Sequence, residues 1–140
     1  MSPSNNRFKI ELADGWEDQT VHYFMGPDES GLQHSLSLQV DPKPNTDILS
    51  EYARERIDQM LESIPGAEIL KEEEKQLPSG APAYEAVYKW APTEDRVVFQ
   101  KLVFVKHGKV MYNFNAVFTK KTIKTLGVEV DRMIAELIPG

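Results

Sequence analysis

The chain has 140 residues, of which 41% are hydrophobic, and this size and composition predict one domain over residues 1–140 with one hydrophobic core. Its 22 acidic and 16 basic residues give a net charge of −6, which argues against binding to nucleic acid or to an anionic membrane surface. The absence of cysteine excludes a disulfide framework, a thiolate metal site, a thiol nucleophile and a lipoprotein attachment point. No apolar run has the length of a signal peptide or a membrane span, so we expect a cytoplasmic protein that does not insert into the membrane.

The first third of the chain predicts strands after a disordered tip over residues 1–6. Residues 7–12 alternate in polarity and predict a first strand that a turn containing Gly15 ends. Residues 19–25 predict a second strand, and residues 34–41 predict a third. The loop between the second and third strands is rich in glycine and proline, so this part of the chain predicts a β-meander.

Helices flank the remaining strands of the predicted fold. Apolar residues at helical spacing predict a helix over 49–64, which Pro65 and Gly66 end, and a second amphipathic helix after Thr119. Between the two helices, the alternation and the turn signals predict four more strands over residues 67–76, 82–90, 96–106 and 109–118. This order predicts an α+β fold in which an antiparallel sheet carries both amphipathic helices on one face.

Two strands carry unusual polar faces. The third strand alternates Leu36, Leu38 and Val40 with small or amide side chains, and the strand over 109–118 alternates in a similar way. If the helices cover the apolar set, the open face shows hydroxyls and amides in place of long charged side chains, which favours close approach by another chain. The second strand could add Val21 and Tyr23 or the opposite pair, and for the strand over 96–106 we choose the register that places Gln100 on the open face.

No pattern in the sequence indicates catalysis. Dinucleotide, phosphate-loop, zinc-protease and nucleophile-elbow motifs are absent, and the three histidines are too scattered for a metal motif. The acidic run over 68–75 alternates its carboxylates between two faces of a strand, which predicts a solvated edge and no cation site. We expect the side chains of Trp16 and Trp90 to pack in the core or against a turn, and not to line a ligand pocket. We therefore expect no enzyme activity, no catalytic residue, no bound metal and no cofactor.

Several segments, taken in order, resemble the DcrB-like proteins and in particular the Eag chaperones of type VI secretion. The first is Leu12–Phe24, with Trp16 followed by Glu17, Asp18 and Gln19. The others are the serine-bearing strand over 35–41, Tyr52-Ala53-Arg54, Leu61 with Ile64-Pro65-Gly66, Tyr88 with Trp90, and Leu102-Val103-Phe104-Val105. The likeness covers residues 7–138.

The resemblance implies a PsbP-like fold, a homodimer and a cytoplasmic adaptor. Such an adaptor binds the N-terminal transmembrane segments of a toxic effector, shields them from water and helps to load the effector onto the type VI spike protein complex. The client-binding residues that the resemblance and the open face together indicate are Val21, Tyr23, Ser35, Ser37, Gln39, Ile64 and Gln100. Relatives carry a neutral polar residue where this chain has Arg56, so the resemblance assigns Arg56 no contact.

Two other functions compete with this one. The first is a PsbP-like accessory domain that docks on a folded partner through a flat surface. The second is a small-molecule enzyme that uses His22 or His34 with nearby carboxylates, for which the sequence shows no nucleophile or base pair.

Overall fold

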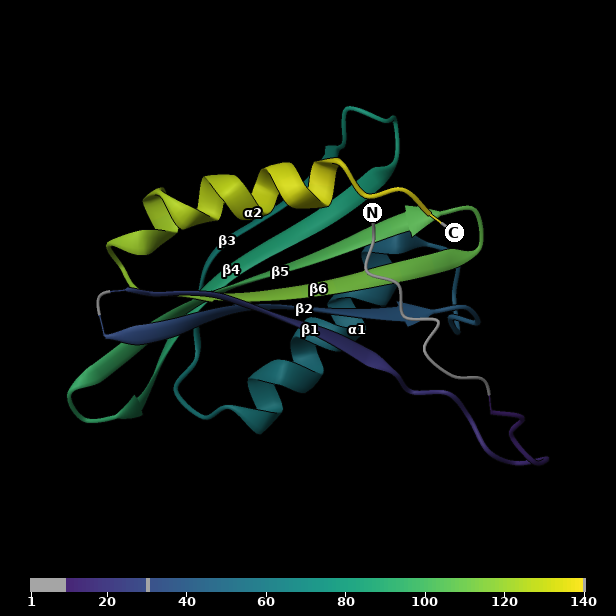
Figure 1. Cartoon of the computed structure of the whole chain (residues 1–140), viewed down its shortest axis with the longest axis horizontal. Helices are drawn as coiled ribbons and strands as arrows, with labels where there is room; N and C mark the ends of the chain where they lie inside the picture. Colours follow the sequence, from purple (N-terminus) through teal and green to yellow (C-terminus); the bar gives the residue numbers. More distant parts are fainter. Residues whose placement is uncertain (1–9, 30, 140) are drawn as a thin grey trace.

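The computed structural model describes residues 10–29 and 31–139. Within these residues an antiparallel sheet has the strand order β1-β2-β6-β5-β4-β3 (Figure 1). The elements in chain order are β1 (Val21–Glu29), β2 (Leu32–Asp41), α1 (Leu49–Ser63), β3 (Glu68–Gln76), β4 (Pro82–Thr93), β5 (Arg96–His107), β6 (Val110–Phe118), the 3-10 helix η1 (Thr122–Lys124) and α2 (Leu126–Ala135). The predicted α+β class and antiparallel sheet are confirmed.

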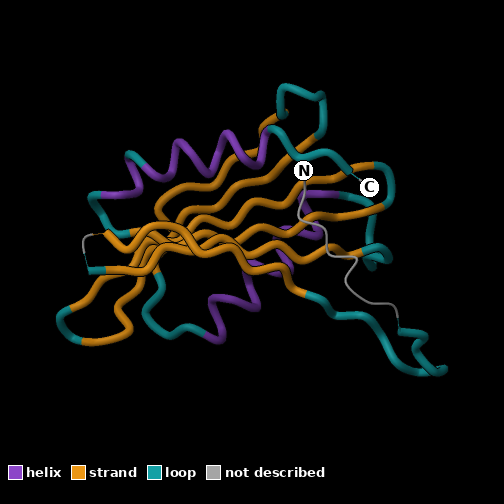
Figure 2. The backbone as a smooth tube through the Cα atoms, viewed as in Figure 1, coloured by secondary structure: helices purple, strands orange, loops and turns teal. Residues whose placement is uncertain are grey.

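The strand predicted over residues 7–12 is wrong where the structure describes it. Residues 10–12 form no strand, and residues 7–9 lie, with the predicted disordered tip over 1–6, outside the described residues. The side chain of Ile10 is 71% exposed and that of Leu12 is 44% exposed. We call residues 10–20 the N-terminal arm, which extends away from the sheet before β1 begins (Figure 2).

The helices lie on opposite faces of the sheet, so the prediction that both pack on one face is wrong (Figure 1). Val130 and Ile134 of α2 belong to a buried cluster with Val103 and Val105 of β5 and with alternate apolar side chains of β6, from Tyr112 to Phe118. Tyr52, Ala53 and Ile57 of α1 belong to a second cluster with Ala86, Phe104 and Met111. Since successive strand residues point to opposite faces, the two clusters lie on the two sides of the sheet.

The middle of β5 explains this arrangement. Val103, Phe104 and Val105 are consecutive and at most 3% exposed, so this strand is apolar on both faces. A central strand with two apolar faces needs cover on both sides, as in sheets buried between layers. Each helix supplies one of these covers, and the backbone of α1 lies closest to β4 and β5.

Candidate functional site

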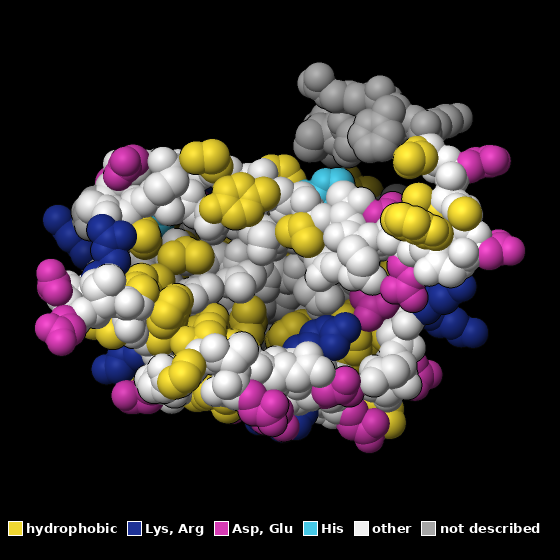
Figure 3. Space-filling view, turned by 90° about the horizontal axis from the view of Figure 1, so that it is seen from below, with side chains coloured by type: hydrophobic (Ala, Val, Ile, Leu, Met, Phe, Trp, Pro, Cys, Tyr) yellow, Lys and Arg dark blue, Asp and Glu magenta, His cyan; other side chains and the backbone are white. Residues whose placement is uncertain are grey.

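A groove lies on the α1 face, beside the helix. It has a volume of about 410 Å³, and it is bordered by α1, by the floor strands β2, β6 and β5, and by the start of β1. Figure 3 looks onto this side of the molecule, where hydrophobic side chains surround the hollow. Of the predicted client-binding residues, five line the groove, namely Val21, Ser37, Gln39, Ile64 and Gln100.

The strand register places the other two predicted residues on the same face. Tyr23 of β1 pairs with Ser37, and Ser35 of β2 pairs with Val117 of β6. Their side chains therefore point to the α1 side, but neither residue lines the groove, and Ser35 belongs to the lining of a separate pocket beside α2. The register also shows which residues of β1 and β5 lie on the α1 face, a point on which the sequence allowed two alternatives. On β1 they are Val21 and Tyr23, and on β5 they are the alternate residues that include Gln100, as predicted.

One stripe of α1 forms the wall of the groove. Arg56, Met60 and Ser63 lie one helical turn apart and line it, and Ile64 follows directly after the helix. Sequence reasoning missed this wall because it placed α1 on the other face of the sheet. The spacing of Arg56, Met60 and Ser63 beside the buried stripe was the signal that could have revealed it.

The floor of the groove is a network of amides held in fixed orientations. The Trp90 indole Nε1 donates a hydrogen bond to Gln100 Oε1 at 2.6 Å, and Gln100 Nε2 donates to Asn115 Oδ1 at 2.9 Å. Ser37 Oγ is 3.4 Å from the main-chain oxygen of Asn115, to which it donates. Gln100 is only 8% exposed, so its amide orients Asn115 and Trp90 more than it offers free hydrogen-bonding capacity.

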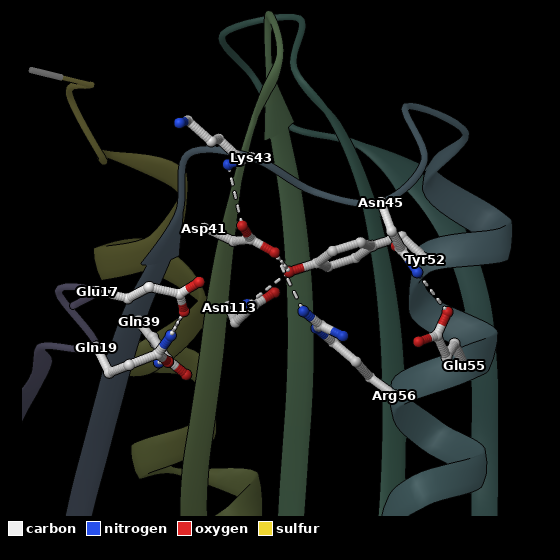
Figure 4. Close-up of polar contacts among 10 residues, drawn as sticks. All are labelled: Glu17, Gln19, Gln39, Asp41, Lys43, Asn45, Tyr52, Glu55, Arg56 and Asn113. Carbon is white, nitrogen blue, oxygen red and sulfur yellow. Dashed lines mark hydrogen bonds and ion pairs between the residues drawn. The ribbon is translucent and has the colours of Figure 1, made fainter. Parts of the chain in front are cut away.

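A second polar cluster closes one end of the groove (Figure 4). The Tyr52 hydroxyl donates to Asp41 Oδ2 at 2.9 Å and accepts a hydrogen bond from Asn113 Nδ2 at 2.8 Å. The Arg56 Nη2 atom lies 3.1 Å from the same Asp41 oxygen. Burial raises the pKa of the Tyr52 hydroxyl, so it remains a proton donor at neutral pH.

Arg56 joins this cluster to the groove. Its guanidinium lies 4.0 Å from the centre of the Tyr52 ring, a cation–π contact that adds to the ion pair with Asp41. The pair leaves little net charge at this end of the groove. The Asn113 Oδ1 atom is buried and has no hydrogen-bond partner within the described residues.

The described residues carry no group of three or more histidine, aspartate or glutamate side chains that could hold a metal ion. His34, one candidate of the enzyme hypothesis, is 4% exposed and lies on the α2 face. Its Nδ1 is 2.9 Å from the main-chain oxygen of Pro27, and its Nε2 is 2.6 Å from Thr122 Oγ1. Because both ring nitrogens are engaged, His34 serves to join β2 to η1.

No helix over residues 10–29 and 31–139 is long and apolar enough to cross a membrane. The groove itself combines an apolar rim with spaced hydroxyls, amides and one neutralised ion pair. Such a surface suits an elongated apolar ligand that carries a few hydrogen-bonding groups.

Comparisons with known proteins give a family and a fold. The crystal structure of PA94, a protein of unknown function from Pseudomonas aeruginosa, superimposes with a TM-score of 0.77 at 17% identity, over 98% of this chain and 94% of that one. CyanoP, the cyanobacterial PsbP of Synechocystis sp. PCC 6803, has a TM-score of 0.49 at 10% identity, over 87% and 94% of the two chains. The Ran-binding protein Mog1p of Saccharomyces cerevisiae has a TM-score of 0.48 at 14% identity, over 84% and 69%. A search of curated proteins finds no match. The family model DcrB matches residues 8–131, and the chain therefore belongs to the DcrB family.

Proposed function

We propose that this protein is a non-catalytic chaperone that covers an apolar helical segment of a client protein in water. The observation that carries the proposal is the groove on the α1 face, with its apolar rim and its floor of serine and amide side chains. A membrane helix in water needs cover for its apolar side chains, and small polar partners let another backbone approach closely.

The position of the groove suits a helix that lies alongside α1. Its wall extends from Arg56 to Ile64, and its floor consists of neighbouring strands. The apolar side chains of Met60, Ile64 and Val21 border it on two sides. Ser37 and Gln39 on the floor have one side-chain hydrogen bond each among the described residues, so they keep capacity for polar groups of a client.

The client that we propose is the N-terminal transmembrane region of a type VI secretion effector. The support is the resemblance of the segment Leu12–Phe24 and of the later motifs to the Eag chaperones. On this proposal the protein acts in the cytoplasm, as a homodimer, and delivers the effector to the spike protein complex without catalysing a reaction or binding a cofactor.

Binding of a model membrane helix tests this function. The probe is a fluorescent peptide of about 20 leucine and alanine residues with lysines at both ends, the length of a bilayer span. We expect it to bind the wild-type protein, and we expect Gln39→Glu to weaken binding by ~10-fold or more, because a carboxylate without a partner would face the apolar helix.

The matched control is Gln76→Glu on the exposed edge strand β3. Gln39 and Gln76 each donate one side-chain hydrogen bond of 3.1 Å, to Gln19 and to the main-chain oxygen of Gly80. The two substitutions therefore make the same chemical change at sites of similar bonding. If the wild-type protein fails to bind the helix, or if Gln39→Glu binds it as well as Gln76→Glu does, the groove is not a client site.

A further inference from the structure

Arg56 is the only charged side chain among the described residues that line the groove. The other lining residues are apolar or carry hydroxyl and amide groups. The Arg56 side chain is 31% exposed, so part of its guanidinium is open to a ligand in the groove. Together with Asp41, Tyr52 and Asn113 it closes this end of the groove (Figure 4). An apolar helix does not continue past such a polar cluster, so a client helix that lies in the groove ends at Arg56.

The free hydrogen-bonding capacity of this cluster consists mainly of donors. Asp41 accepts hydrogen bonds from the Tyr52 hydroxyl, from Arg56 Nη2 and from the main-chain nitrogen of Lys43. A guanidinium carries five N–H groups, and among the described residues only Asp41 accepts a hydrogen bond from Arg56. The remaining N–H groups of Arg56 can therefore bind acceptors of a client, whereas most of the acceptor capacity of Asp41 is used.

The two ends of a helix differ in the groups that they present to such a cluster. The last four main-chain carbonyls of a helix have no partner within the helix, and neither do the first four N–H groups. The N–H groups of Arg56 match the carbonyls of a C-terminal end, and they offer no acceptor to an N-terminal end. Arginine side chains bind the last carbonyls of helices in this way, where they also meet the partial negative charge of the helix end.

The opposite end of the groove favours the same direction. There the lining consists of Ser63 and Ile64, at the C-terminal end of α1. The last turn of α1 contains Glu62 and no basic residue, so no cation in this turn offsets the partial negative charge of the helix end. The N-terminal end of a neighbouring helix carries a partial positive charge and is attracted to this position.

We propose that the client helix lies antiparallel to α1, with its C-terminal carbonyls bound by the guanidinium of Arg56 and its N-terminal side toward Ile64. This inference rests on the proposed function and deepens it, because it gives the client a direction and Arg56 a role. The wall from Arg56 to Ile64 is about 12 Å long at the rise of an α-helix, so it accommodates roughly the last two turns of the client helix.

Thiol crosslinking on the full chain tests this direction. The chain has no cysteine, so Lys43→Cys places a single thiol beside Asp41 at the Arg56 end, and Ser63→Cys places one at the Ile64 end. The probe is the leucine–alanine model helix with lysines at both ends, made with a maleimide either on its N-terminus or on its C-terminus. We expect the C-terminal maleimide to react about threefold faster at position 43, and the N-terminal maleimide about threefold faster at position 63.

The design isolates the ends of the helix from other effects. Both probes carry lysines at both ends, so these charges favour neither direction. Each comparison is made on one thiol, so the intrinsic reactivity of that thiol cancels. Neither cysteine variant alters the Tyr52, Asp41 or Arg56 side chain, so the ratio of rates measures direction with the polar cluster in place.

A matched pair of variants tests the role of Arg56. Arg56→Met removes the N–H groups and should bring both ratios of rates closer to one. Arg54→Met is the control, because Arg54 lies on the same helix and forms ion pairs with Asp58 and Glu72 but does not line the groove. It should leave both ratios unchanged.

Each outcome decides a separate point. Equal rates for the two probes, or the reverse preference, would overturn the antiparallel direction and leave the client function standing. The same ratios in Arg56→Met as in Arg54→Met would overturn the role of Arg56. If the wild-type protein binds neither probe, the client function fails and the direction of the client fails with it.

Discussion

At the scale of the residue, the least expected feature is a buried carboxylate on the α2 face. Glu85 is 2% exposed, and the Nζ atoms of Lys75, Lys71 and Lys101 lie 2.7, 3.4 and 4.0 Å from its oxygens. Burial by itself raises the pKa of Glu85, but the hydrogen bond from Lys75 and the charges of Lys101, Lys75 and Lys71 together lower it. Lys101 also binds Asp131 at 2.9 Å, so the network ties α2 to β4 and β5.

The substitution Glu85→Gln should destabilise the fold by about 3 kcal/mol, because it leaves Lys101 buried without one of its partners. The depressed pKa also predicts a pH dependence. The contribution of Glu85 is fully present above the ordinary carboxyl pKa of 4.5 and is lost as the pH falls through the lower folded value. Urea unfolding between pH 7 and pH 3 should show a loss of stability in the wild type that is smaller in the variant. Equal slopes in the two proteins would contradict this role for Glu85.

At the scale of the element, the position of α1 decides the shape of the groove. Tyr52 is fully buried and packs edge-on against Phe104, with ring centres 6.1 Å apart. Its hydroxyl bonds both Asp41 at the end of β2 and Asn113 in β6, so one side chain ties the helix to two floor strands. We infer that Tyr52 fixes the distance between the wall and the floor.

The substitution Tyr52→Phe keeps the ring and removes both hydrogen bonds. It should lower the free energy of unfolding by about 1–3 kcal/mol, because the buried amide of Asn113 loses its partner. Tyr84→Phe is the control, since the Tyr84 hydroxyl makes a single exposed hydrogen bond of 2.9 Å to Glu72 and its loss should cost about 0.5 kcal/mol or less. Thermal unfolding of both variants measures the difference. If the two substitutions lower the free energy of unfolding by the same amount, the Tyr52 hydroxyl does not anchor the helix.

At the scale of the whole molecule, the sequence predicts strands better than it predicts layers. Alternation and turn residues place β2 to β6 within a few residues of their observed bounds, because these local signals act on each strand alone. The face that carries Ser37, Gln39 and Gln100 is also predicted, since a side-chain period of two is local. The side on which a helix packs depends on contacts between distant segments. The run Val103-Phe104-Val105, which is apolar on both faces, was a second clue, because it indicates that both sides of the sheet need cover.

The N-terminal arm also shows that local patterns do not predict contacts between distant segments. Alternation at Ile10 and Leu12 predicts a strand, yet a strand also needs a neighbour to pair with, and residues 10–12 pair with no strand among the described residues. The polar cluster of Tyr52, Asp41 and Asn113 was equally hidden, because its members come from three elements and Asn113 lies 61 residues from Tyr52. Local patterns predict what each element is, and contacts between elements decide how the site is built.

Two cores on opposite sides of one sheet should respond to substitution independently. Ile57 of α1 and Ile134 of α2 are 0% and 3% exposed, and they belong to different clusters. Ile57→Val and Ile134→Val should each cost about 1 kcal/mol, and the double variant should cost the sum within about 0.5 kcal/mol, because the sheet separates them. Ile57→Val with Phe104→Leu is the comparison pair, since both residues belong to the α1 cluster, and this pair should deviate from additivity. Urea unfolding of the single and double variants measures both couplings. Strong coupling between Ile57 and Ile134 would mean that the helices share one core, which the opposite-face arrangement does not allow.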